Sequence, residues 1–368
     1  MDCISNRMNK IDASGIRKVF DLAKDMKNPV NLSIGQPDFD IPDHLKDKAI
    51  EAIKKGHNTY TLTQGIPELR TEVRNHLEKR RINPEEILIT SGVSGGILLS
   101  LFAIINPGDE IIIPDPYFVM YKHLVNLLDG KPVFIDTYPD FRFTAKRIAP
   151  KITSKTKAIL LNSPANPTGV ALDNNDLQEL ANLAEKHSLL VISDEIYSPF
   201  SYDSHHKSIA EFYDKTLVLD GFSKSHAMTG WRLGYAAGPA ELINQMTKVQ
   251  QYTFVCAPSI AQKVGVEALK SHVMQGYIDA YREKREIIVQ GLLEKFEFTV
   301  PNGTFYIFPK APGGDGEAFV MEAIRNNLLI IPGNVFSEKN THFRISFAAK
   351  NETLQKGIEI LNRIADKI

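Results

Sequence analysis

Short apolar runs alternate with longer stretches of helical periodicity over residues 40–239. The clearest runs fall at residues 87–90, 158–161, 189–192 and 216–219, and glycine, proline, asparagine or aspartate follows each one closely. Runs of β-branched and aliphatic residues that end in such breakers predict buried strands. Because strands that alternate with helices build open α/β sheets, the pattern predicts an α/β fold with a doubly wound, mostly parallel sheet.

The pattern changes at about residue 241. A long helical stretch leads from there into a mixed segment, in which strands are predicted at residues 304–308, 328–331 and 343–347. In the last of these strands, alternation puts Arg344 and Ser346 on one face. The sequence therefore predicts a second, smaller α+β domain.

A helical arm is predicted before the sheet, because Ile16, Val19, Phe20 and Ala23 follow helical spacing. At 368 residues the chain exceeds the size of one typical hydrophobic core, so two domains are expected. We place the arm and part of the smaller domain at residues 1–39, the larger domain at 40–240 and the rest of the smaller domain at 241–368.

Charge and composition argue against several classes of partner. The net charge of −1 gives no electrostatic case for nucleic acid or a membrane surface. No apolar run approaches the length of a membrane span, and the N-terminus lacks the apolar core of a signal peptide, so a cytoplasmic location is expected. Cys3 and Cys256, the two cysteines, make neither a disulfide framework nor a metal-binding pattern, and no metal is expected.

Side chains with chemical potential follow the predicted strands. Lys224 comes soon after one strand, Asp194 and Tyr197 follow another, and Asn166 lies in a turn after a third. The carboxyl ends of parallel strands meet at one edge of an open sheet, which is where α/β folds bind ligands. We therefore expect these side chains to lie close together at that edge.

This set has the chemistry that pyridoxal 5'-phosphate (PLP) needs. Lys224 can form a Schiff base with the aldehyde, and Arg232 can pair with the phosphate. Asp194 can hold the ring nitrogen protonated, as the electron-sink role of this cofactor requires. The glycine-rich run at residues 91–96 begins a predicted helix, where backbone N–H groups bind phosphate. The structural alternatives are a surface lysine, a salt-bridged arginine, a helix-capping aspartate and an ordinary turn.

Eight stretches in order give the chain a resemblance to the class I/II aminotransferases, which are PLP enzymes of the aspartate aminotransferase fold (fold type I). The stretches are SIGQPDFDIP (33–42), NTYTLTQGIPELR (58–70), PDPYFVMY (114–121), NSPANPTG (162–169), SDEIY (193–197), GFSKSHAMTGWRLGY (221–235), GTFYIFP (303–309) and FRISFA (343–348). The resemblance covers nearly the whole chain, and eight ordered matches are far more specific than any one of them.

The resemblance implies a role for each matching residue. Lys224 resembles the Schiff-base lysine that also shuttles the proton, and Asp194 resembles the partner of the pyridine nitrogen. The remaining cofactor contacts that it implies are Asn166 and Tyr197 at the phenolic oxygen, Val93, Ser94, Ser223 and Arg232 at the phosphate, and Phe118 stacked on the ring. Arg344 resembles the arginine that binds the substrate α-carboxylate, helped by the backbone of Gly35 and by Asn166. The structural alternatives are a core aromatic for Phe118 and an ion pair for Arg344.

Tyr60 resembles a tyrosine that reaches the cofactor phosphate of the neighbouring subunit, so the resemblance implies a homodimer with shared active sites. The alternative is an ordinary surface or core tyrosine. The implied reaction is transamination between an L-amino acid and a 2-oxo acid such as 2-oxoglutarate.

The sequence does not determine which amino acid donates the amino group. Classical aspartate enzymes read the distal carboxylate with an arginine from the partner subunit, and the corresponding residues 252–263 contain no arginine. Aspartate, aromatic and acyl-diaminopimelate aminotransferases all remain similar to this chain. Two other functions remain as alternatives. One is a PLP-dependent C–S lyase on the same scaffold, and the other is a catalytically idle PLP-binding regulator. The intact Lys224, Asp194 and Arg344, and the lack of an appended DNA-binding module, argue against the regulator.

Overall fold

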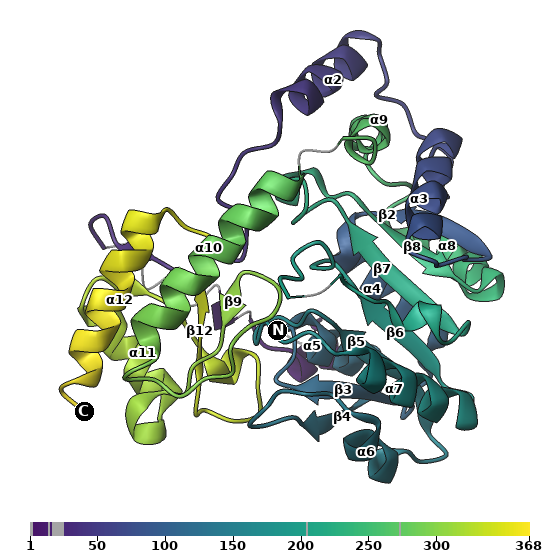
Figure 1. Ribbon diagram of the computed structural model, residues 1–368. Helices are drawn as coiled ribbons and strands as arrows, with labels where there is room; N and C mark the ends of the chain where they lie inside the picture. The colour runs from purple at the N-terminus through teal and green to yellow at the C-terminus, as the bar shows by residue number, and fades with distance from the viewer. Residues whose placement is uncertain (1–2, 14, 17–25, 204, 272–273) are drawn as a thin grey trace.

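A seven-stranded sheet runs through the larger part of the molecule, with the strand order β2-β8-β7-β6-β5-β3-β4 (Figure 1). The computed structural model describes residues 3–13, 15–16, 26–203, 205–271 and 274–368. In sheet order, the strands are β2 (Glu86–Thr90), β8 (Gly234–Gly238), β7 (Thr216–Gly221), β6 (Leu190–Asp194), β5 (Thr156–Asn162), β3 (Glu110–Asp115) and β4 (Lys131–Asp136). Strand β8 runs antiparallel to both neighbours and the remaining adjacent pairs are parallel. The predicted doubly wound, mostly parallel sheet is confirmed.

Helices cover both faces of this sheet, because successive side chains along a strand point to opposite faces. Leu160 of β5 packs in one core with α4, whereas its neighbour Ile159 packs in another core with α7. The helices of this part are α2 (Asp43–Lys54), α3 (Pro67–Lys79), α4 (Gly92–Ile104), α5 (Met120–Leu127), α6 (Ala145–Ile148), α7 (Asn174–Lys186), α8 (Ala240–Thr253) and α9 (Ser259–Ala268). Burial on both faces explains why the strands read as continuous apolar runs rather than as alternating ones.

Among the described residues, the smaller part of the fold holds two short sheets and three helices. Strand β1 (Val30–Asn31) pairs in parallel with β10 (Leu328–Leu329), while β12 (Phe343–Ser346) lies between β11 (Ile331–Pro332) and β9 (Tyr306–Ile307) in an antiparallel sheet. The helices are α10 (Met274–Leu292), α11 (Gly316–Arg325) and α12 (Asn351–Ala365). The predicted α+β character of this part is confirmed.

Two details of the predicted strands are wrong. The apolar run at residues 328–331 forms two strands in different sheets, because the chain leaves its pairing with β1 and begins one with β12. The predicted strand at 304–308 is reduced to two residues, because the side chain of Thr304 bonds the backbone N–H of Tyr306. Both differences depend on hydrogen-bond partners, which hydrophobicity does not encode.

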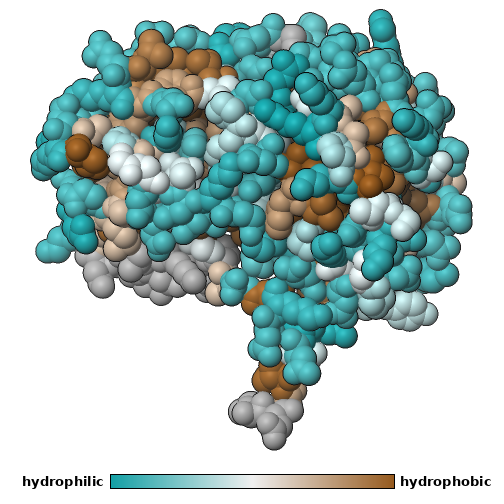
Figure 2. Space-filling model, turned by 90° about the horizontal axis from the view of Figure 1, so that it is seen from below, coloured by the Kyte–Doolittle hydropathy of each residue, from teal (hydrophilic) through white to brown (hydrophobic). Residues whose placement is uncertain are grey.

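Most of the predicted N-terminal arm, including Val19, Phe20 and Ala23, lies outside the described residues. The β1–β10 pair brings an N-terminal segment against the C-terminal part of the chain. The domain boundaries after residues 39 and 240 stay predictions. No helix in the described ranges is long and apolar enough to cross a membrane. The face in Figure 2 is mostly hydrophilic, with separate apolar patches.

Candidate active site

A cavity of about 290 Å³ opens beside the carboxyl ends of β5, β6 and β7 and the start of α4. Eleven of the twelve predicted site residues line it, namely Gly35, Val93, Ser94, Phe118, Asn166, Asp194, Tyr197, Ser223, Lys224, Arg232 and Arg344. The twelfth residue, Tyr60, does not line the cavity, and 84% of it is exposed. The roles implied for these residues remain predictions, but their convergence is a property of the fold.

Asp194 ends β6 and is almost fully buried. Its Oδ2 accepts a hydrogen bond of 2.7 Å from the Tyr121 hydroxyl, and its Oδ1 accepts one of 3.2 Å from the backbone N–H of Ile196. Burial raises the pKa of Asp194 to about 6, although both hydrogen bonds oppose the shift. No cationic side chain of the described residues lies within ion-pair distance of Asp194. A buried carboxylate without a cation favours a positively charged ligand group.

Lys224 follows β7, and its ammonium group donates to the carbonyl oxygen of Gly35 at 2.5 Å. Burial, together with the nearby charges of Arg344 and Arg232, lowers the pKa of Lys224 to about 8, while Asp194 opposes this shift. The lowered pKa increases the neutral amine fraction near neutral pH. Only the neutral amine can attack an aldehyde or accept a proton.

Arg344 lies in β12 with 2% of its surface exposed. Its Nη1 donates to Oδ1 of Asn166 at 3.0 Å and its Nη2 to the carbonyl of Ser33 at 2.9 Å. Its Nε is buried and has no hydrogen-bond partner among the residues that the structure describes. The guanidinium lies 4.4 Å from the ring centre of Tyr306 and 4.6 Å from that of Phe336. Among the described residues no carboxylate pairs with it, so the geometry suits an incoming anion.

Arg232 and the first turn of α4 face the same side of the cavity. Arg232 has a left-handed backbone (φ 55°), and its Nη1 donates to the carbonyl of Thr229 at 3.0 Å. A Cβ at Gly92 would lie 2.7 Å from Nη2 of Arg232, so the guanidinium fits there only because residue 92 is glycine. Val93 and Ser94 follow in the first turn of the helix, where N–H groups and the helix dipole favour an anion.

Two tyrosines meet in the cavity wall. The hydroxyl oxygens of Tyr197 and Tyr306 lie 3.0 Å apart, and both side chains are buried. The ammonium group of Lys224 lies 5.9 Å from the ring centre of Tyr197. A phenol and an amine therefore face the same small volume.

Three residues with clear contacts at this site were not predicted: Tyr121, Asn162 and Tyr306. Asn162 ends β5 directly opposite Asp194 in register, and its Nδ2 donates to the Asp194 carbonyl at 2.9 Å. The signal that identified Asp194, a polar residue after an apolar run, could have identified Asn162 as well. Tyr121 and Tyr306 stand in two of the eight matching stretches, but no pattern within the sequence indicates their partners.

The described residues contain no group of three or more histidine, cysteine, aspartate or glutamate side chains that could hold a metal ion. The polar groups that line the cavity are one carboxylate, one amine, two guanidinium groups and several hydroxyl and amide groups.

The family model for aminotransferases of class I and II matches residues 27–361. A probable aspartate aminotransferase of Methanocaldococcus jannaschii is 38% identical, over 98% of this chain and 99% of the relative. An aromatic-amino-acid aminotransferase of Thermococcus litoralis is 35% identical over 98% of each chain. The crystal structure of the aspartate aminotransferase from Rhizobium meliloti superposes with a TM-score of 0.94 at 32% identity, over 99% of this chain and 98% of that one.

Proposed function

The chain belongs to the class I and II aminotransferases, and we propose from this premise that it transfers the amino group of an L-amino acid to a 2-oxo acid such as 2-oxoglutarate, with PLP bound through a Schiff base to Lys224. One observation carries the proposal. Asp194 and Arg344 are buried charged groups that make no ion pair within the described residues, and both face the cavity that also holds Lys224. Burying a charge without a partner costs free energy, so such a cavity suits a ligand with complementary charges.

The residues present fit PLP. Asp194 lacks a cation, which a protonated pyridine nitrogen would supply. The first turn of α4 and the Arg232 guanidinium, seated over Gly92, form a cradle for a phosphate dianion. Lys224 supplies an amine of lowered pKa for the aldehyde.

When bound, PLP supplies an electron-withdrawing ring that stabilises the negative charge left at a substrate carbon. Arg344 binds the substrate α-carboxylate and thereby fixes the direction of the bond from the α-carbon to hydrogen. Once the substrate amine has displaced it from the aldehyde, Lys224 would be a free amine that accepts that proton at Nζ and donates it again. Asp194 would keep the ring nitrogen protonated, and Asn166 and Tyr197 would hydrogen-bond the phenolic oxygen.

The cavity favours a donor without a distal carboxylate. Lys224, Arg232 and Arg344 are the cationic side chains that line it within the described part of the chain. Each has a task in the proposed reaction, so among the residues that the structure describes no cation of the cavity is left for a second carboxylate. Ile16, which also lines the cavity, supplies apolar surface. We therefore propose that aromatic donors react with a higher kcat/KM than aspartate does.

A panel of amino donors with 2-oxoglutarate as acceptor tests the proposal. We expect formation of glutamate with ping-pong kinetics and a preference for tyrosine or phenylalanine over aspartate. Pyruvate released from cysteine or cystathionine without any acceptor would support a C–S lyase instead. The absence of a 2-oxo acid product from every donor would refute transamination.

A further inference from the structure

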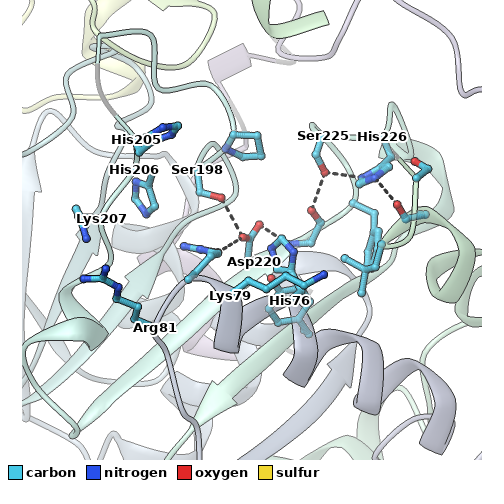
Figure 3. A pocket seen from close by; sticks show the side chains of 18 of the residues that line it. His76, Lys79, Arg81, Ser198, His205, His206, Lys207, Asp220, Ser225 and His226 are labelled. Atoms are coloured by element: carbon cyan, nitrogen blue, oxygen red, sulfur yellow. Dashed lines mark hydrogen bonds and ion pairs between the residues drawn. The ribbon is translucent and has the colours of Figure 1, made fainter. Parts of the chain in front are cut away.

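A second cavity has a volume of about 520 Å³, and Figure 3 shows the side chains that line it. The two cavities share two segments of chain. Tyr197 and Lys224 line the first cavity, while the residues next to them, Ser198 and Ser225, line the second. The second cavity is therefore a distinct space on the other side of the residues after β6 and β7.

The polar groups on the inner wall of the second cavity are hydrogen-bonded to one another. Asp220 accepts hydrogen bonds of 3.1 Å each from Nη1 of Arg80 and from the Ser198 hydroxyl. Arg80 also pairs with Glu195. His226 uses both ring nitrogens, one with the Ser225 hydroxyl and the other with the backbone carbonyl of residue 268. One guanidinium is thus shared between two carboxylates, and Glu195 has further partners in the Ser208 hydroxyl and the His206 ring.

The opening carries basic side chains without counterions. Lys79 ends α3 and Arg81 follows it, and neither has an ion pair or side-chain hydrogen bond with any residue that the structure describes. The same holds for the ring nitrogens of His76 and His205. Figure 3 shows Arg81 and His205 on one side of the cavity together with Lys207, which is paired with Glu211. Two uncompensated cations and two imidazoles therefore border one hollow.

His76, on the α3 side of the second cavity, contributes hydrogen-bonding groups rather than positive charge. Burial lowers the pKa of His76 to about 4, and the charges of Arg80, His226 and Lys79 act in the same direction. At neutral pH its ring therefore offers one N–H donor and one acceptor. The positive potential at this end comes from Lys79 and Arg81.

We propose that the second cavity binds a small phosphate-bearing anion, held at its opening by Lys79 and Arg81. A carboxylate is planar and is satisfied by one guanidinium, whereas a phosphate group presents oxygens in several directions. The hydrogen-bond donors of this cavity come from two separate segments, the end of α3 and the loop at residues 205–207. Donors from two segments can contact the oxygens of a tetrahedral phosphate group from different directions. The volume leaves room beyond the phosphate for the body of an ester, against Phe222 and the Ser198 and Ser225 hydroxyls.

The test is isothermal titration calorimetry of the protein loaded with PLP and then freed of unbound PLP by gel filtration, in a phosphate-free buffer of low ionic strength. Saturation with PLP fills the proposed phosphate cradle at Arg232, so binding there does not contribute. The probes are inorganic phosphate, glucose 6-phosphate and, as the uncharged control, glucose. A tighter dissociation constant for the ester identifies an ester ligand, and equal constants identify free phosphate.

The matched variants are Lys79→Gln and Arg81→Gln, with Lys356→Gln as control, because Lys356 is an exposed lysine on α12 at the far end of the molecule in Figure 1. Each cavity variant is expected to weaken binding roughly fivefold, the factor for an ion pair worth about 1 kcal/mol, and the control to leave it unchanged. The absence of binding to the wild-type protein, or equal dissociation constants in all variants, would overturn the proposal.

Discussion

The Tyr121 hydroxyl donates a hydrogen bond of 2.7 Å to Oδ2 of Asp194, and both side chains are buried. This bond stabilises the ionised carboxylate and limits the rise of its pKa that burial causes. Asp194 can pair with a protonated ring nitrogen only while it is ionised. In the proposed reaction Tyr121 would therefore be a positioning residue that acts on PLP through Asp194.

Tyr121→Phe is expected to raise the pKa of Asp194 above about 6, because the ionised form loses a hydrogen bond. PLP affinity of the apoprotein should fall as the pH drops through the pKa of Asp194, and in the variant this fall should occur at higher pH. Fluorescence titration of PLP binding between pH 5 and pH 8 measures the shift, about one pH unit for a lost charge-assisted bond.

Tyr117→Phe is the matched control for this prediction. Its hydroxyl donates to Glu338 at 2.7 Å, and Tyr117 does not line the cavity. The control should bind PLP with the pH dependence of the wild type. A Tyr121→Phe profile that coincides with the wild type would show that the bond to Asp194 does not tune the carboxylate.

Covalent attachment of PLP to the apoprotein should show a midpoint near pH 8, because the pKa of Lys224 is lowered to about 8 from its ordinary value of 10.5. The lysine is protonated and unreactive below this pKa and reactive above it. Stopped-flow absorbance measures the rate, and borohydride reduction with peptide mapping should place the pyridoxyl group on Lys224. A midpoint near 10.5, or label on another lysine, would refute the assignment.

The sequence predicted Asp194, Lys224 and Asn166 at one edge of the sheet because each follows an apolar run that ends in a breaker. Because such runs form parallel strands, their carboxyl ends meet at one edge of the sheet, and this does not depend on how the side chains pack. The sequence did not predict Tyr121 as a site residue because it lies on a helix and not at the end of a strand. Only tertiary packing brings its hydroxyl to Asp194. The run 328–331 was read as one strand because its residues are all apolar, while its division depends on which backbone groups lie opposite.

Arg344→Gln should lower kcat/KM by about 100-fold or more while PLP stays bound, because a desolvated pair of arginine and carboxylate is lost. The melting temperature of the apoprotein should not fall, since no carboxylate of the described residues loses its partner. Steady-state kinetics and calorimetric melting measure the two effects. A lower melting temperature with unchanged kcat/KM would assign Arg344 a structural role.

Arg285→Gln supplies the opposite case for comparison. Arg285 is also buried, but it pairs with Asp203 and Glu286 at 2.8 and 2.7 Å. It does not line the cavity. Its loss should lower the melting temperature and leave kcat/KM unchanged, because the two carboxylates lose their partner.

The exposed position of Tyr60 supports the prediction that the active site is shared between two subunits. Its side chain is 84% exposed in the single subunit, and it does not line that subunit's cavity. Large exposed aromatic residues are typical of protein interfaces. Gln262, whose amide donates to Thr61 at 2.9 Å, ties the segment that holds Tyr60 to α9. Tyr60 is thus held on the surface, in a position from which a second subunit could receive it.

Mixed dimers of Tyr60→Phe and Lys224→Ala subunits decide whether Tyr60 acts across the interface. If it does, one site of the mixed dimer combines the intact Lys224 of one subunit with the intact Tyr60 of the other, and the second site carries both changes. If Tyr60 serves its own subunit, each site carries one change and no intact site forms. Differently tagged subunits purified as mixed dimers should therefore recover about half of the wild-type activity per dimer, more than either parent. Activity no higher than the average of the two parents, or a fully active monomer by sedimentation, would contradict the shared site.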